Sequence, residues 1–104
     1  MRVFVSAVAA AVLALGSGAA FADGEAAMNK AGCMACHAKD KKLVGPSFKD
    51  IAAKYKGQDV TAKLFDKVRK GGSGVFGPIP MSPNGPDKIA DPDLKDAIAV
   101  ILKS

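Results

Sequence analysis

The sequence predicts an all-α domain built from about four short helices. Apolar residues recur at helical spacing in several segments, and glycine, proline or a capping residue bounds each segment. No pair of segments shows the alternating pattern of neighbouring strands. The 104 residues contain no internal repeat, low-complexity tract or long linker, so we expect one folded domain.

The first two helices are expected in the first half of the chain. One should cover about residues 25–32. The next has Ser47 as a capping residue with Asp50 three positions later, and it should end before Gly57. Its apolar residues at positions i, i+3, i+4 and i+7 are Phe48, Ile51, Ala52 and Tyr55.

Two more helices are expected in the second half. Apolar side chains share one face over residues 60–70, which Gly71 terminates. The last helix should begin with Asp91 as cap and Pro92 at its first helical position. The segment from Gly71 to Pro92 holds five of the six prolines, so we expect it to lack regular structure. Long ordered loops of this kind are usually functional.

The segment Cys33-Met34-Ala35-Cys36-His37 carries the most specific chemistry. Two thiols three residues apart, followed at once by an imidazole, form the attachment signature of c-type haem. Because positions i and i+3 of a helix project to the same side, both sulfurs can form thioethers along one edge of a porphyrin. The motif predicts one covalent haem c per chain, with His37 as an iron ligand. In so small a domain the haem would become part of the core.

Three other sites use a Cys-x-x-Cys pair: a thioredoxin-like redox centre, half of a zinc site, and a structural disulfide. A zinc site needs about four ligands, and Cys33, Cys36 and His37 are the only thiols and imidazole in the chain. A thioredoxin-like site expects alternating strands and helices, which this sequence does not show. The haem interpretation is therefore favoured.

The N-terminal segment has the features of a secretory signal peptide. Met1-Arg2 gives a positive start, residues 3–15 are apolar, and Ala20-Phe21-Ala22 is a small-x-small cleavage site. An uncleaved membrane anchor is the alternative, but the apolar run is shorter than the ~20 residues that a spanning helix needs. We expect residues 1–22 to be cleaved and residues 23–104 to form the mature domain in the periplasm, without stable membrane insertion.

The charge balance indicates the class of partner. Residues 23–104 contain 14 basic and 10 acidic residues, a formal net charge of +4. A nucleic-acid-binding protein is expected to gather its basic residues in a stripe, which is not seen here. A mildly basic surface favours acidic proteins instead. Lys39, Lys41 and Lys42 lie close to the haem motif and are candidate docking residues, although they are equally typical of a solvated loop.

A haem iron bound by His37 needs a second ligand, and the chain has no other histidine. Methionine and lysine remain. Met34 lies inside the motif and Met28 precedes it on the same expected helix, so neither readily reaches the opposite face of the ring. Met81 is distant in sequence and lies in a loop stiffened by prolines, which makes it the candidate ligand. A gap-filling apolar side chain is the alternative.

Two neighbouring segments are candidates for hydrogen bonds to these ligands. A backbone carbonyl of the turn Val44-Gly45-Pro46 can accept the Nδ1 proton of His37 and so fix the tautomer of the ring. The Asn84 amide can donate to the sulfur of Met81. Both segments are also typical of plain turns.

These residues together resemble the small bacterial class I monohaem c-type cytochromes of the cytochrome c-551 and c-552 kind, which are periplasmic carriers. The similarity spans nearly all of residues 23–104. It rests on Gly32-Cys33 through His37, on Val44-Gly45-Pro46, on residues 50–55, and above all on Gly74-Val75-Phe76-Gly77-Pro78-Ile79-Pro80-Met81. The last stretch is more specific than the attachment motif.

The resemblance implies the class I cytochrome c fold, with the helices wrapped around the haem. It implies thioether bonds at Cys33 and Cys36, and axial ligation by His37 and Met81. It further implies that Pro46 supplies the carbonyl partner of the histidine and that Asn84 forms a hydrogen bond near the methionine. The other residues expected in the haem pocket are Gly45, Lys67, Phe76, Ile79 and Pro80.

The chain departs from the family at two positions. Where the family commonly has a tryptophan that donates to a haem propionate, this chain has Phe76, and it contains no tryptophan. Another donor is therefore needed, and Lys67 is the candidate. The aromatic residue that the family has in its last helix is replaced by Val100, which alters local packing but not the ligands.

The expected function is that of a soluble electron carrier and not of an enzyme. With both axial positions filled and no acid or base beside the iron, a substrate has no place to bind. The expected partners are larger redox proteins, with a membrane cytochrome complex as donor and a terminal reductase or oxidase as acceptor. A monomer that binds no nucleic acid is expected. The sequence identifies neither the pathway nor the reduction potential.

Other functions remain open at this point. A haem-based gas sensor would release Met81 to bind a small ligand, and carbon monoxide titration of the reduced protein distinguishes a sensor from a carrier. A peroxidase fits less well because it needs a second, acid–base histidine on an open distal side. A structural role would require that haem is never attached.

Overall fold

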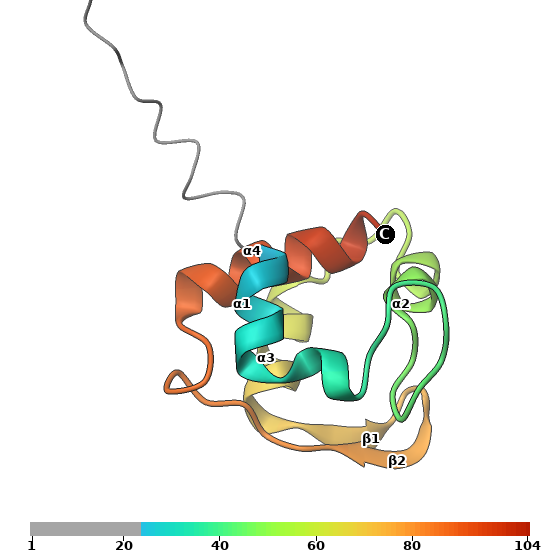
Figure 1. Ribbon diagram of the computed structural model, residues 1–104. Coiled ribbons are helices and arrows are strands. Elements are labelled where there is room, and N and C mark those ends of the chain that lie inside the picture. Colours follow the sequence, from blue (N-terminus) through green and yellow to red (C-terminus); the bar gives the residue numbers. More distant parts are fainter. Residues whose placement is uncertain (1–23) are drawn as a thin grey trace, which may run out of the picture.

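The computed structural model describes residues 24–104, so the expected signal peptide, residues 1–22, and its cleavage site lie outside the described residues. The described chain is mainly helical, with one small sheet (Figure 1). Its elements are α1 (Gly24–Ala31), the 3₁₀ turn η2 (Cys33–Ala35), α2 (Phe48–Lys54), α3 (Thr61–Lys70), β1 (Gly72–Gly74), β2 (Gly77–Met81) and α4 (Asp91–Leu102). The prediction of four short helices is confirmed.

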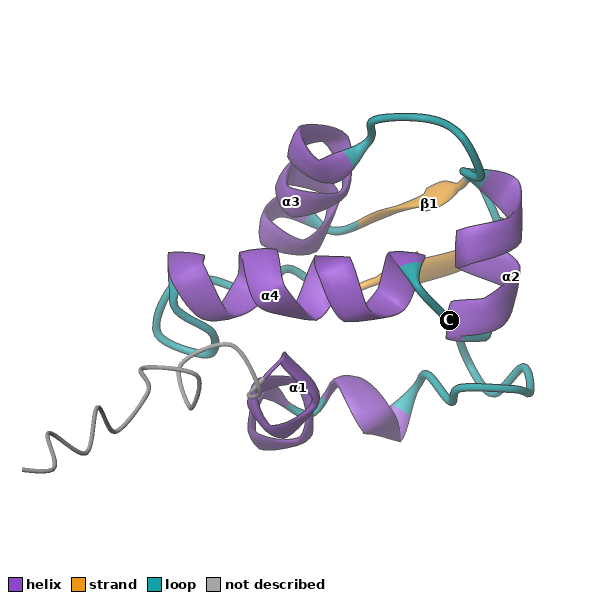
Figure 2. Cartoon of the chain, turned by 90° about the horizontal axis from the view of Figure 1, so that it is seen from above, coloured by secondary structure: helices purple, strands orange, loops and turns teal. Residues whose placement is uncertain are grey.

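Helices α1 and α4, from opposite ends of the described chain, lie side by side in both Figure 1 and Figure 2. Gly24 permits this approach. A Cβ atom at this position would lie 2.8 Å from the carbonyl oxygen of Asp96 and 2.9 Å from Cγ2 of Val100. Any side chain here would push the two helices apart, since atoms this close must move.

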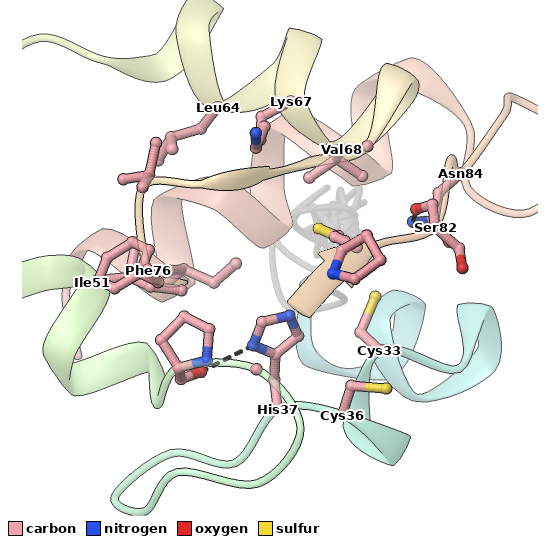
Figure 3. Close-up of a pocket in the computed structure, with 18 of the residues that line it drawn as sticks. Cys33, Cys36, His37, Ile51, Leu64, Lys67, Val68, Phe76, Ser82 and Asn84 are labelled. Atoms are coloured by element: carbon pink, nitrogen blue, oxygen red, sulfur yellow. Dashed lines mark hydrogen bonds between the residues drawn. The ribbon is translucent and has the colours of Figure 1, made fainter. Parts of the chain in front are cut away.

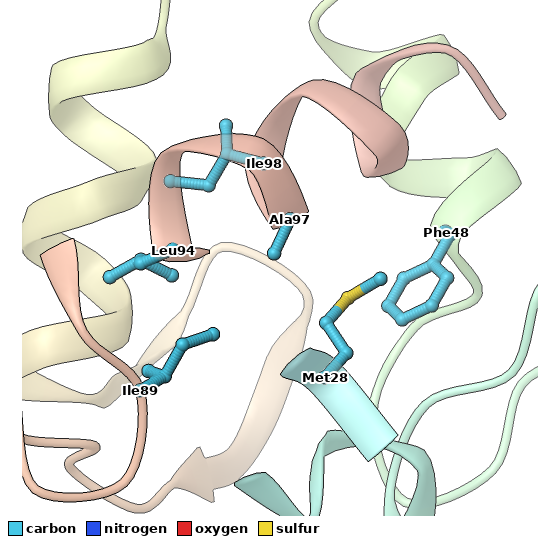
Figure 4. Close-up of a cluster of buried hydrophobic side chains, with 6 residues drawn as sticks. All are labelled: Met28, Phe48, Ile89, Leu94, Ala97 and Ile98. Atoms are coloured by element: carbon cyan, nitrogen blue, oxygen red, sulfur yellow. The ribbon is translucent and has the colours of Figure 1, made fainter. Parts of the chain in front are cut away.

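The hydrophobic core forms where α4 meets α1, α2 and the loop before α4 (Figure 4). Its members are almost fully buried; Ala97 and Ile98, for example, are each 1% exposed. The six core residues are Met28, Phe48, Ile89, Leu94, Ala97 and Ile98. All six also border the large cavity described below. The core side chains therefore also form one wall of that cavity.

The start of α2 agrees with the sequence. The backbone N–H of Asp50 donates to Oγ of Ser47 at 3.0 Å, which satisfies one of the free donors at the helix N-terminus. Ser47 is 2% exposed, so its hydroxyl has little access to water. The prediction of Ser47 as N-cap is confirmed.

The start of α4 differs from the expectation by one residue. Its N-cap is Ala90, which provides no side-chain hydrogen bond, and Asp91 is already within the helix. The Asp91 carboxylate accepts a hydrogen bond from Arg69 on α3 instead. The prediction of Asp91 as the cap was wrong because a partner distant in sequence binds this carboxylate.

The segment after α3 also differs from the expectation. β1 and β2 pair antiparallel, with Gly72 opposite Met81 and Gly74 opposite Gly77, and the register is irregular between these pairs. The prediction that this part of the loop lacks regular structure was wrong. The sequence gives little indication of these strands for two reasons. Pro78 and Pro80 have no backbone N–H to donate, and every residue of the two strands except Met81 is exposed. Exposure on both faces removes the usual alternation.

None of the helices within residues 24–104 has the length and apolar character that a membrane crossing requires.

Candidate haem site

A cavity of about 710 Å³ opens between the core, α3 and the strand pair. This volume lies within the range typical of ligand and cofactor sites, ~300–1,000 Å³. Its walls include Cys33, Cys36, His37 and Met81, so the fold brings the four principal predicted residues to one space. The seven other predicted pocket residues also border it: Gly45, Pro46, Lys67, Phe76, Ile79, Pro80 and Asn84.

The attachment motif forms a compact turn after α1. Gly32 adopts the left-handed conformation (φ 85°), which ends α1 and turns the chain into η2. The Cys33 carbonyl then accepts hydrogen bonds from the N–H groups of Cys36, at 3.2 Å, and His37, at 3.0 Å. Figure 3 shows both sulfurs and the His37 ring on one side of the cavity, opposite Leu64, Lys67 and Val68 of α3.

The two thiols are not joined in a disulfide. Cys33 is half-buried, whereas Cys36 is exposed. Burial raises the pKa of the Cys33 thiol, a backbone hydrogen bond partly opposes this rise, and the neighbouring Cys36 adds to it. Cys33 therefore faces an apolar environment. Within residues 24–104 no three His, Cys, Asp or Glu side chains are grouped so that they could hold a metal ion, which leaves the zinc interpretation without a ligand set.

The His37 imidazole is held on three sides. Its Nδ1 donates to the carbonyl oxygen of Pro46 at 2.8 Å, the hydrogen bond dashed in Figure 3. Its ring stacks on Phe48 with 5.6 Å between the ring centroids. Gly45 closes the third side, because a Cβ there would lie 2.5 Å from Cε1 of the ring. With the proton on Nδ1, Nε2 carries a free lone pair, which is the form of histidine that ligates a metal.

Met81 ends β2 and is half-buried at the cavity wall. Its position is fixed by backbone contacts with the end of α3. Gly72 is its partner in the sheet, and Gly71 packs so closely against the Met81 carbonyl and the Pro83 nitrogen that a Cβ has no room. The backbone N–H of Asn84 donates to the Val68 carbonyl at 2.9 Å.

The Asn84 side chain has a different partner from the expected one. Its Nδ2 donates to the Ser82 carbonyl at 2.9 Å, and no hydrogen bond to the Met81 sulfur is formed. Asn84 thus braces the turn that follows Met81. A short polar side chain that bonds to a nearby carbonyl is a usual turn device.

The rim of the cavity is basic. Phe76 is 40% exposed at its edge, and the Lys54 ammonium lies 5.6 Å from the centre of its ring. The Lys67 ammonium reaches over the strand pair, since a Cβ on Gly72 would lie 3.0 Å from it. Only Asp66 opposes the positive charges that border the cavity, namely Lys42, Lys63, Lys67, Lys70 and Lys88.

These features together fit a haem. The core side chains give the cavity an apolar wall that suits a flat macrocycle. Two thiols and an imidazole with a free Nε2 lie on one side of it, and the basic rim suits the carboxylates that a porphyrin carries. The residues present therefore match the expected cofactor in shape, polarity and reactive groups.

One well-ordered contact was missed by sequence reasoning. Arg69 of α3 is 14% exposed in its side chain, and its Nη1 donates to the carbonyl oxygens of Asn84, at 3.2 Å, and Ile89, at 2.8 Å. Its Nη2 donates to Oδ1 of Asp91 at 2.5 Å, and its guanidinium carbon lies 5.0 Å from the centre of the Phe65 ring. No local pattern signals these partners, because they lie 15 to 22 positions away.

Comparison with known proteins also indicates a haem protein. The family model described as Cytochrome c matches residues 21–104. Cytochrome c2 of Rubrivivax gelatinosus is 50% identical over 76 residues, which is 72% of this chain and 89% of the relative. Cytochrome c-551 of Pseudomonas aeruginosa is 49% identical over 71 residues, 67% of this chain and 68% of the relative. The crystal structure of wild-type Nitrosomonas europaea cytochrome c552 superposes with a TM-score of 0.70 at 42% identity and covers 76% of this chain and 96% of that one.

Proposed function

Because this chain belongs to the cytochrome c family, and so is an electron-carrier cytochrome with one covalently attached haem c, we propose that it is a soluble periplasmic one-electron carrier with His/Met ligation. In this proposal Cys33 and Cys36 form the thioethers, and His37 and Met81 bind the iron from its two sides. The haem supplies the Fe(III)/Fe(II) couple when bound. The surrounding protein groups hold and orient the ligands.

The observation that carries the proposal is that His37 and Met81 border the same cavity as both thiols. The hydrogen bond to Pro46 holds the His37 ring with Nε2 free and raises its basicity as a ligand. The sheet pairing with Gly72 holds Met81 at the end of a short, stiff strand. Ligands held this rigidly need not move when the charge of the iron changes, which favours rapid electron transfer.

The same arrangement supports a carrier role without catalysis. With His37 and Met81 both bound to the iron, no coordination position is left for a substrate. A thioether ligand is neutral and favours the ferrous state, so a relatively high reduction potential is expected. His37 is the only histidine in the chain and its Nδ1 proton is already donated to Pro46, so it has no proton to exchange with a substrate.

Periplasmic location and the partners belong to the proposal as well. The features of residues 1–22 support export. The basic rim of the cavity and the lysines Lys39, Lys41 and Lys42 beside the motif support docking of acidic redox proteins at the haem edge. A membrane cytochrome complex as donor and a terminal reductase or oxidase as acceptor are the proposed classes of partner.

Spectroscopy of the purified protein and of Met81→Ala tests the ligation. The oxidised wild-type protein should show the near-infrared band of a Met-to-iron bond, and Met81→Ala should lose this band and have a lower potential. Met34→Leu is the control and should keep the band. A Met81→Ala protein that retains the band would refute the assignment. Rapid and complete binding of carbon monoxide by the reduced wild-type protein at neutral pH would favour the gas sensor instead.

A further inference from the structure

The segment that follows Met81 is fastened to α3 by one side chain. Arg69 donates to the carbonyl oxygens of Asn84 and Ile89 and to the carboxylate of Asp91, so it joins the start of this segment, its end and the first residue of α4. A guanidinium can do this because its donors are fixed in a planar fork. A lysine has the same charge but a single ammonium, which cannot hold three acceptors in these directions.

The surroundings of Arg69 make these bonds strong. Its side chain is only 14% exposed, and it lies over the Phe65 ring, so water competes little for its donors. Hydrogen bonds from a charged donor are stronger than neutral ones. Two of the acceptors are backbone carbonyls, so Arg69 fixes the path of the main chain and not only a side chain.

The fastened segment begins three residues after Met81. Between them, the Asn84 backbone N–H donates to Val68, the residue before Arg69, and the Asn84 amide donates to Ser82. On the other side of Met81, the one strand paired with β2 among the described residues is the short and exposed β1. For Met81 to move away from the cavity, the chain after it must therefore move too, and Arg69 opposes that movement.

We propose that Arg69 is a positioning residue that keeps Met81 on the iron by holding the backbone of residues 84–91 against α3. This inference rests on the proposed ligation by Met81. It assigns to a residue outside the cavity wall control over how often the sixth ligand leaves. Loss of the Arg69 guanidinium and its hydrogen bonds should increase the rate at which Met81 leaves the iron, without changing which residue is the ligand.

Exchange of Met81 for added imidazole in the oxidised holoprotein measures this directly. At high imidazole concentration the rate of binding stops rising and equals the rate at which Met81 leaves the iron. Arg69→Lys, which keeps the charge, should raise this limiting rate about tenfold or more, the size expected when hydrogen bonds from a charged donor are lost. Asp91→Asn, which keeps both carbonyl bonds, should raise it less.

A second readout does not depend on the haem iron. The Asn84 amide, bonded to the Val68 carbonyl, should exchange its hydrogen with solvent faster in Arg69→Lys than in the wild-type protein. Val100→Ala is the matched control for a general loss of stability, because Val100 packs at the α1–α4 contact and is not among the hydrogen-bond partners of Arg69. It should change neither the limiting rate nor the Asn84 exchange.

The outcomes separate the two proposals. If the wild-type protein lacks the near-infrared Met band, the proposed ligation by Met81 is refuted, and the role of Arg69 is refuted with it. If the band is present but Arg69→Lys keeps a limiting rate within about twofold of wild type, well below the loss expected for charged hydrogen bonds, only the role of Arg69 is refuted. An equal rise in Val100→Ala would also refute it, since the effect would then be one of overall stability.

Discussion

Gly45 lies against the face of His37, where a Cβ would be 2.5 Å from Cε1 and 2.9 Å from Nδ1 of the ring. The Gly45 N–H also donates to the Cys36 carbonyl at 2.8 Å, so this backbone cannot retreat without breaking a bond to the attachment motif. The position of the imidazole thus depends on the absence of a side chain one residue before its hydrogen-bond acceptor.

Gly45→Ala should displace the His37 ring and weaken its bond to Pro46. The overpacking should lower the free energy of unfolding by about 1–3 kcal/mol. Urea denaturation of the holoprotein and its reduction potential measure the two effects. Gly85→Ala is the control, because its nearest neighbour is only the end of the flexible Asp87 side chain. If both variants are as stable as wild type, Gly45 does not constrain the ring.

Removal of the haem should unfold most of the domain. All six core residues border the cavity, so without the cofactor their apolar surface faces water. A chain of this size has little other core to compensate. The double variant Cys33→Ala/Cys36→Ala, produced without haem, should lose most of the helical circular dichroism and all cooperative unfolding. Retention of both would mean that the helices are stable without the cofactor.

Ser47→Ala should destabilise the holoprotein by about 0.5–2 kcal/mol, because the Asp50 N–H at the start of α2 loses its acceptor. Burial of this site makes the upper part of that range the expectation, since water cannot replace the hydroxyl. Urea denaturation checks the value, with Ser73→Ala in the exposed strand β1 as the control. Equal stability of the two variants would contradict a role for the cap.

Lys67→Met should lower the reduction potential. A positive charge at the cavity favours the ferrous state. Its removal should lower the potential by roughly 20–60 mV, where about 59 mV corresponds to a tenfold change in the equilibrium constant of a one-electron couple. Potentiometric titration measures the shift, with the exposed Lys103→Met as the control. An unchanged potential would contradict the prediction that Lys67 donates to the haem propionates.

Electron transfer to an acidic redox protein should slow as salt is added, because Lys39, Lys41 and Lys42 attract the partner over a distance that ions screen. Stopped-flow rates over a series of ionic strengths measure this. The triple variant with glutamine at these three positions should be slower at low salt and nearly insensitive to salt. A wild-type rate independent of ionic strength would exclude steering by these lysines.

The sequence anticipated those parts of the fold that depend on local chemistry. Ser47 and Asp50 form a cap within four residues, and the helical spacing of Phe48, Ile51 and Tyr55 follows directly, so α2 was predicted correctly. The haem motif is equally local. The cavity-lining residues were named because their motifs are continuous stretches of sequence.

What the sequence did not reveal depends on distant partners. The strand pair that presents Met81 consists of glycines and prolines exposed on both faces, and such residues carry no strand periodicity. Asp91 has the local pattern of a cap, but Arg69, 22 positions away, binds its carboxylate. The Asn84 amide was expected to donate to Met81, whereas in the structure it donates to the Ser82 carbonyl.

The closure of α1 onto α4 through Gly24 has a consequence for assembly. α4 is synthesised long after α1, so the first helix lacks its main packing partner while most of the chain is being made. Cys33 and Cys36 follow α1 immediately, so we expect both thiols to stay accessible during that time. If the haem is attached at these thiols as proposed, the topology should leave an interval for the attachment reaction before α4 packs against α1.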